Sequence, residues 1–161
     1  MGKTNSGSIK ELVTFFLDEC LPYPVAEVLH RVGYNIVSWH TEFNGEQGIK
    51  DPQVIQYLGG KRYTLITVDK EAKRKHSNDI RAAQISVVWI KGLSRGKSKH
   101  SDPHIDIKDL HRMLTMKLDE MAEIISKSKS PRYFTLRLIA GGKAKLEPIS
   151  LEDTKISQFD I

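Results

Sequence analysis

The fold is decided by the stretch Leu65-Ile66-Thr67-Val68-Asp69. Its β-branched and apolar residues are typical of a buried strand, and the acidic Asp69 stands where the apolar run stops. A second stretch, Thr14 to Leu17, repeats the pattern and is followed at once by Asp18. Ligands of open α/β sheets bind outside the carboxyl ends of the strands. Two strands that end in acids therefore predict one shared acidic site.

The composition indicates a soluble globular protein. A chain of 161 residues is long enough to bury a core, and no apolar run approaches the roughly 20 residues of a transmembrane helix. The single cysteine, Cys20, excludes an internal disulfide and a cysteine-built zinc site, which fits a reducing compartment. The net charge of +5 leans toward polyanionic partners. We expect a cytoplasmic protein.

Strands and helices are predicted to alternate along the chain. Apolar, β-branched runs predict strands at residues 14–18, 34–39, 65–69, 87–90 and 133–139, with an edge segment at 145–149. Helical spacing of apolar residues predicts helices at 25–32, 52–58, 78–85 and 107–125. Alternation with short connections favours a single α/β domain whose mostly parallel central sheet is flanked by helices.

Turn and capping residues suggest where these elements begin and end. Asp51 before Pro52 is typical of a helix start, Asp106 is placed to cap the long helix, and Gly59-Gly60 is expected to end the helix before the central strand. The polar stretches 40–50 and 92–103 are expected to be loops.

The acids form a pattern of their own. Asp18, Asp51 and Asp69 each lie at a strand end or at the helix start facing it, and Asp79 is a candidate fourth member. Asp51 and Asp79 have a purely structural explanation as helix caps, and Asp18 and Asp69 as turn formers. Their conjunction favours a site for Mg²⁺ or Mn²⁺, because hard divalent cations prefer carboxylate oxygens. Such a site can activate water against a phosphodiester. Glu19 is a substitute ligand only.

Several short motifs follow one another in a characteristic order: Phe16-Leu17-Asp18-Glu19, Val25-Ala26-Glu27-Val28-Leu29, Gly33-Tyr34-Asn35-Ile36-Val37, Lys50-Asp51-Pro52-Gln53-Val54-Ile55 and Leu65-Ile66-Thr67-Val68-Asp69-Lys70. This order resembles the PIN-like domains, and most closely the compact group related to VapC-type toxins. The likeness runs from about residue 14 to residue 90.

The resemblance implies a Rossmann-like fold and a metal-dependent endoribonuclease, often the toxin of a toxin–antitoxin pair. It implies that Asp18, Asp51 and Asp69 bind the metal and that Thr67 supports the site. Asp79 stands where relatives often carry Glu, which leaves the fourth ligand open. The expected division is a flexible leader at 1–10, a PIN-like domain at 11–149 and a tail at 150–161. The expected partners are RNA and an antitoxin protein, with a homodimer left open.

Basic and aromatic residues flank the predicted site. Lys70, Lys73 and Arg74 follow Asp69 and are expected to guide the RNA backbone, a contribution that salt weakens. Three aromatic residues are able to stack bases, although packing is the simpler role for each: Tyr23, Trp39 and Tyr63. His40 and His76 also flank the acids, where they either touch a substrate phosphate or are plain surface histidines.

Two other function classes remain open. One is a catalytically silent PIN-like module that binds RNA or a protein partner. The other is a receiver-like signalling domain, which also clusters aspartates with Mg²⁺ at strand ends and would use Lys91 after the fourth strand. The order of the motifs argues against the receiver-like domain.

Overall fold

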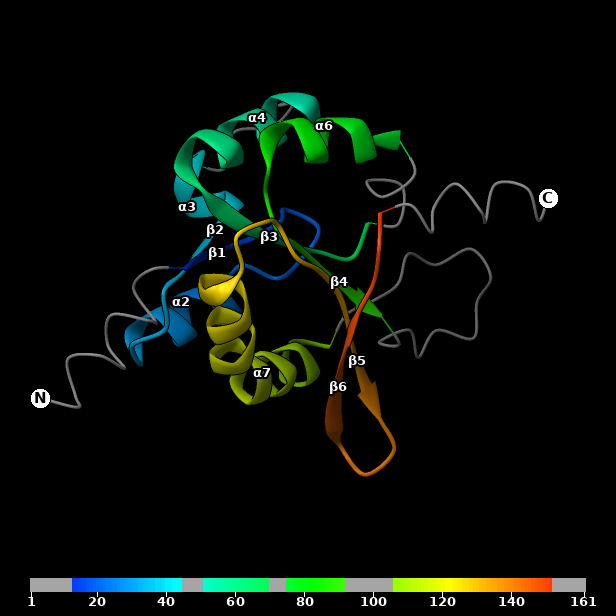
Figure 1. Ribbon diagram of the computed structural model, residues 1–161. Coiled ribbons are helices and arrows are strands. Elements are labelled where there is room, and N and C mark those ends of the chain that lie inside the picture. Colours follow the sequence, from blue (N-terminus) through cyan, green and yellow to red (C-terminus); the bar gives the residue numbers. More distant parts are fainter. Residues whose placement is uncertain (1–12, 45–50, 70–74, 92–105, 152–161) are drawn as a thin grey trace, which may run out of the picture.

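The computed structural model describes residues 13–44, 51–69, 75–91 and 106–151 (Figure 1). One six-stranded sheet forms its centre, in the order β2-β1-β3-β4-β5-β6. The strands are β1 (Thr14–Leu17), β2 (Ile36–Ser38), β3 (Tyr63–Thr67), β4 (Val87–Lys91), β5 (Tyr133–Ile139) and β6 (Lys143–Pro148). The helices are α2 (Pro24–Arg31), α3 (Trp39–Glu42), α4 (Asp51–Lys61), α6 (Ser77–Ala83) and α7 (Ile107–Lys127).

The sheet is parallel from β2 through β5, and β6 alone returns antiparallel beside β5. The chain runs from β1 outward to β2 and then crosses back to place β3 on the other side of β1. The strand order therefore reverses at β1 and β3. In open α/β sheets the crevice at such a reversal is the usual ligand site. The predicted mostly parallel α/β sheet is confirmed.

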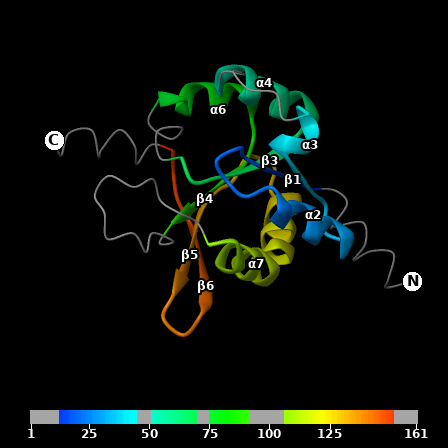
Figure 2. The same cartoon turned by 180° about the vertical axis from the view of Figure 1, so that it is seen from behind.

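Helices cover both faces of the sheet (Figures 1 and 2). α2 and α7 lie on one face, where Leu29 and Leu114 pack against Phe15 and Leu17 of β1 in one apolar cluster. α3, α4 and α6 lie on the other face, where Phe16 of β1 belongs to a second cluster. Because side chains alternate along a strand, β1 is buried on both faces, as its unbroken apolar run indicates.

The second strand is shorter than predicted. Trp39 begins α3 instead of ending β2, and part of the predicted loop at 40–50 is helical. The Ser38 hydroxyl accepts a hydrogen bond from the Thr41 amide at 3.2 Å, which caps the new helix. The Trp39 ring packs 4.8 Å from that of Phe43, so core packing stabilises this short helix. Residues 45–50 lie outside the described part of the chain.

α4 does not end at Gly59-Gly60 as predicted; it continues to Lys61. A Cβ on Gly59 would lie 2.9 Å from the Cβ of Ala83, so this glycine allows α4 to pack closely against α6. The chain leaves the helix at Arg62, whose φ of 59° is left-handed. Gly59 therefore serves helix packing, and the helix ends at Lys61, one residue beyond Gly60.

The remaining expectations concern the second half of the chain. α7 begins as predicted, because the Asp106 carboxylate accepts from the Lys108 amide at 2.8 Å. Ile107 is one of the apolar residues whose helical spacing predicts a buried face for this helix, but its side chain is 51% exposed. Leu151 is 3% exposed and joins the second cluster, so the core extends into the predicted tail. The predicted leader and the stretch 92–103 lie outside the described residues. No helix in the described ranges has the length and apolarity that crossing a membrane requires.

Candidate metal centre at the carboxyl edge

Asp18 is the first residue beyond β1, at the point where the strand order reverses. Its backbone amide donates to the Ile66 carbonyl at 3.0 Å, which continues the pairing of β1 with β3 by one step. Its own carbonyl accepts from the Leu21 amide at 3.0 Å, so the chain turns immediately afterwards. The Asp18 carboxylate is thereby held at the carboxyl edge of the sheet by backbone contacts on both sides.

The Asp18 carboxylate is held by short hydrogen bonds. Its Oδ2 accepts from the Thr67 hydroxyl at 2.7 Å, and its Oδ1 accepts from the Glu19 amide at 2.9 Å. The Thr67 hydroxyl also accepts from the Asp69 amide at 3.1 Å. Thr67 has no exposed surface, so this position favours support of Asp18 over direct contact with a substrate. One hydroxyl thus joins the residues that follow β1 and β3.

The environment of Asp18 disfavours the ionised form of its carboxyl group. Burial raises the pKa of its carboxyl group; the hydrogen bonds from Thr67, the Glu19 amide and Cys20 lower that pKa, and the negative charge of Asp51 raises it further. Burial and the charge of Asp18 also raise the pKa of the Cys20 thiol to about 12. That thiol stays protonated at neutral pH and lies 3.6 Å from Asp18 Oδ2 as a weak donor.

The segment after β3 is fixed by a tryptophan on the neighbouring strand. The Trp89 indole nitrogen donates to the carbonyl of Asp69 at 3.2 Å, and Trp89 is 2% exposed. Asp69 is thus held through both its amide and its carbonyl, two residues beyond the end of β3. Asp69, at the end of the stretch 65–69, therefore lies at the carboxyl edge of the sheet, where the sequence pattern predicts it.

The other two acids stand at helix starts and meet at one histidine. His76 Nε2 lies 3.5 Å from Asp51 Oδ2 at the start of α4, and its Nδ1 lies 3.5 Å from Asp79 Oδ2 in the first turn of α6. The His76 side chain is 18% exposed, against 56% for Asp51 and 50% for Asp79. The sequence analysis did not assign His76 this bridging position. Two features of the sequence point to it: His76 flanks the acids, and it lies three residues before Asp79.

The four acids therefore lie at one edge in two connected pairs. Among the described residues, no group of three or more His, Cys, Asp or Glu side chains is arranged to hold a metal ion. Mg²⁺ does not require such a group, because it usually takes one or two protein carboxylates and keeps several waters. Asp18 and Asp51 fit that chemistry, since each is a hard oxygen donor and their charges are close enough to interact. Lys70, Lys73 and Arg74 lie outside the described residues.

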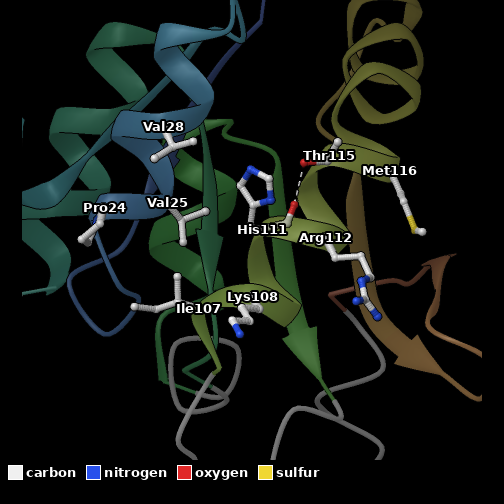
Figure 3. A pocket seen from close by; sticks show the side chains of 9 residues that line it. All are labelled: Pro24, Val25, Val28, Ile107, Lys108, His111, Arg112, Thr115 and Met116. Carbon is white, nitrogen blue, oxygen red and sulfur yellow. Dashed lines mark hydrogen bonds between the residues drawn. The ribbon is translucent and has the colours of Figure 1, made fainter.

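A groove of about 690 Å³ opens between the starts of α2 and α7. Figure 3 shows Val25 and Val28 of α2 facing His111 of α7 across it. Its other lining residues are Pro24, Ile107, Lys108, Arg112, Thr115 and Met116. The lining is thus apolar on the α2 side and carries basic side chains on the α7 side, and none of the described residues that line the groove is acidic.

A known protein family matches about the first half of the chain. Residues 13–92 match the family described as PIN-like domain, and this span runs from β1 to the end of β4 with all four acids inside it. Neither curated proteins nor solved structures provide a match. PIN-like domains are generally nucleases. The match, with the parallel sheet and the acids at its carboxyl edge, shows that the chain belongs to the PIN-like domain family.

Proposed function

We propose that this protein is a Mg²⁺- or Mn²⁺-dependent endoribonuclease and the toxin of a toxin–antitoxin pair. The observation that carries the proposal is the Asp18 carboxylate, which is fixed by Thr67 at the strand reversal and lies within the field of Asp51. Two neighbouring carboxylates in a partly buried site repel each other, and a divalent cation between them relieves that repulsion. The order of the sequence motifs supports the closer likeness to VapC-type toxins.

Each residue has a role in this proposal. Asp18 and Asp51 hold the cation, and Asp69 and Asp79 complete the acidic site. When bound, the cation supplies a lowered pKa for an attacking water and draws in the phosphodiester. Thr67 holds Asp18 in one orientation, and its buried hydroxyl needs no rearrangement to do so.

The substrate side of the proposal rests on charge. The net charge of +5 favours a polyanion, and Lys70, Lys73 and Arg74 follow Asp69 directly in the sequence. These cations are proposed to hold the RNA backbone beside the acids. Their contribution to binding should fall as salt rises, because each phosphate contact releases condensed counterions.

Cleavage of labelled total RNA tests the nuclease proposal. Wild type should cut with Mg²⁺ or Mn²⁺ and stop cutting when a chelator is added, and Asp69→Asn should be inactive while keeping its fold. Asp119→Asn is the matched control, since it removes an exposed carboxylate from α7, outside the acidic edge. Cutting by Asp69→Asn at the wild-type rate, or cutting that survives the chelator, would contradict the proposal.

A silent binding module is the second candidate. The net charge of +5 supports it, because a basic chain attracts a polyanion whether or not it cleaves that polyanion. In that case RNA binding would be sensitive to salt but unchanged by Asp18→Asn or Asp69→Asn. Binding measured by fluorescence anisotropy, beside the cleavage assay, separates the two functions, because a nuclease site responds to loss of these acids and a distant binding surface does not.

An antitoxin requires a surface on this chain, and the groove of Figure 3 suits one kind of partner. Its apolar α2 side and its Lys108, His111 and Arg112 favour an amphipathic helix with acidic flanks. A second copy of the chain fits less well, because the same basic side chains would face each other. We therefore assign the groove to an acidic helical segment of the antitoxin.

A designed amphipathic peptide with glutamate flanks tests this assignment. It should bind the wild-type chain and lose affinity for Val28→Asp, which puts a negative charge in the groove. Val32→Asp is the matched control, since Val32 is 67% exposed at the other end of α2. Equal binding by both variants would reject the groove. Growth arrest on expression of wild type but not of Asp69→Asn tests the toxin role separately.

A further inference from the structure

Two exposed aromatic rings stack face to face near the acidic edge. The rings of Tyr23 and His40 lie with their centroids 4.1 Å apart and their planes 12° from parallel. Tyr23 is 41% exposed, and His40 is also exposed. Tyr23 precedes α2, and His40 is the second residue of α3, so the pair joins the segments that follow β1 and β2.

This pair differs from the other ring contacts among the described residues. Phe16, Trp39, Phe43, Tyr57 and Tyr63 meet at tilted or edge-on angles between 55° and 74°. All five are buried or partly buried on the α4 face of the sheet. Such angles are typical of core packing. The Tyr23–His40 pair is instead parallel and exposed to solvent.

The pair lies close to the proposed catalytic site. Leu17 of β1 is in register with Ser38 of β2. Asp18 follows Leu17 directly, and α3 begins directly after Ser38. Neighbouring strands are about 4.8 Å apart, which makes these two strand ends direct neighbours. The turn after Asp18, closed by the bond from the Leu21 amide to the Asp18 carbonyl, leads to Tyr23 within two further residues.

We propose that Tyr23 and His40 form a stacking platform for an unpaired base of single-stranded RNA. The proposal rests on the nuclease function and narrows its substrate to a strand whose base next to the cleaved phosphate is free to stack. Bases stack on aromatic side chains with little regard to sequence, because every base has a flat π-face. A base that extends the two-ring stack brings its own phosphate toward Asp18.

The Tyr23 ring is dispensable for the start of α2. The Tyr23 carbonyl accepts from the Ala26 amide at 3.0 Å and from the Glu27 amide at 3.3 Å, and its side chain makes no capping hydrogen bond. Replacement by alanine keeps that carbonyl. Tyr23→Ala therefore removes the platform without removing the contacts that begin the helix.

The experiment measures stacking directly. The full chain, in chelator so that no RNA is cut, is titrated into an unstructured oligoribonucleotide that carries one 2-aminopurine, whose fluorescence falls when it stacks. We expect quenching with wild type and with Tyr23→Phe, which keeps the ring. Tyr23→Ala and His40→Ala should weaken binding between about 5-fold and about 100-fold and leave the base bright. Val32→Ala, an exposed apolar change at the far end of α2, should bind like wild type.

The outcomes separate this inference from the nuclease proposal. Quenching that Tyr23→Ala abolishes supports the platform even if no variant cuts RNA. Cleavage by wild type together with wild-type affinity and quenching in Tyr23→Ala would overturn the platform and leave the nuclease intact. The absence of any quenching by wild type, at every position of the 2-aminopurine, would overturn the platform as well.

Discussion

The two halves of the acidic edge are built differently. In the strand half, Asp18 and Asp69 are tied together by the buried Thr67 through bonds of 2.7 and 3.1 Å. In the helix half, Asp51 and Asp79 are about half exposed, and within the described part of the chain they meet at His76, at 3.5 Å on each side. The strand half is therefore fixed by the fold itself, whereas the helix half depends on one side chain.

This difference has an electrostatic counterpart. The rigid Asp18 is partly withdrawn from water, and burial raises the pKa of its carboxyl group. The exposed acids of the helix half keep their solvation. The fixed Asp18 carboxylate thus lowers the free energy of unfolding of the metal-free chain. This is expected where function requires a charged group in a partly buried place.

The largest expected effect comes from neutralising the strand half. Asp18→Asn should lower metal-dependent cleavage on the order of a thousand-fold, since a charged ligand worth several kcal/mol of charge stabilisation is lost while the shape is kept. Single-turnover cleavage at saturating Mn²⁺ measures the loss. Asp119→Asn serves again as the control. If Asp18→Asn cleaved RNA at a rate within ten-fold of wild type, Asp18 would not be a residue of the metal site.

Removal of the Thr67 hydroxyl should have the next largest effect. Thr67→Val keeps the shape of the side chain but deletes the donor to Asp18 and the acceptor for the Asp69 amide. Loss of a partner that orients a metal ligand typically costs about 10-fold to 100-fold in affinity or activity. Mn²⁺ titration should show weaker binding by Thr67→Val, with recovery in Thr67→Ser, which keeps the hydroxyl. Equal Mn²⁺ affinity in all three proteins would show that the bond to Asp18 is incidental.

The strand half was predictable from the sequence, and the helix half only in part. A β-branched run followed by an acid predicts a rigid strand end, and the structure places Asp18 and Asp69 there. The position of His76 depends on where α6 begins, and that start lies one residue earlier than Asn78, where the sequence suggested it. Successive helical residues point about 100° apart, but a residue just before the helix does not follow that spacing, so the direction of the His76 side chain does not follow from the helical pattern.

The errors in the fold have the same origin. Gly59-Gly60 is typical of a helix end, but the close approach of Ala83 requires a residue without a side chain at Gly59. Trp39 fits a strand by its β-propensity, yet its contacts with Phe16 and Phe43 favour a helical turn. In both places packing against a distant segment outweighs the local preference, and a single sequence does not name that segment.

A smaller effect is expected from breaking the helix half. His76→Ala removes the bridge between Asp51 and Asp79, and contacts between exposed charged groups are typically worth 0.2–1 kcal/mol. Mn²⁺ affinity should therefore fall by no more than about five-fold. His30→Ala, which removes an exposed histidine from α2, is the control. A loss as large as that of Thr67→Val would mean that His76 fixes its half as firmly as Thr67 fixes the other.

The smallest expected effect is on stability, and its sign distinguishes the two halves. Because the pKa of Asp18 is raised in the folded state, this carboxyl group favours folding where it is protonated, and that contribution disappears as the pH rises through the folded pKa. At neutral pH the ionised Asp18 therefore destabilises the metal-free chain.

Asp18→Asn removes the charge and keeps an oxygen that accepts from Thr67, so it should raise the free energy of unfolding at pH 7 by about 1 kcal/mol. Urea unfolding in chelator should show this gain shrinking as the pH falls through the raised pKa of folded Asp18, because the wild-type carboxyl group then becomes protonated. Asp119→Asn, which removes an exposed carboxylate of α7 outside the acidic edge, is the matched control. If Asp18→Asn were less stable than wild type at pH 7, the hydrogen bonds to the carboxylate would outweigh its burial, and the rigid half of the edge would be stable without a cation.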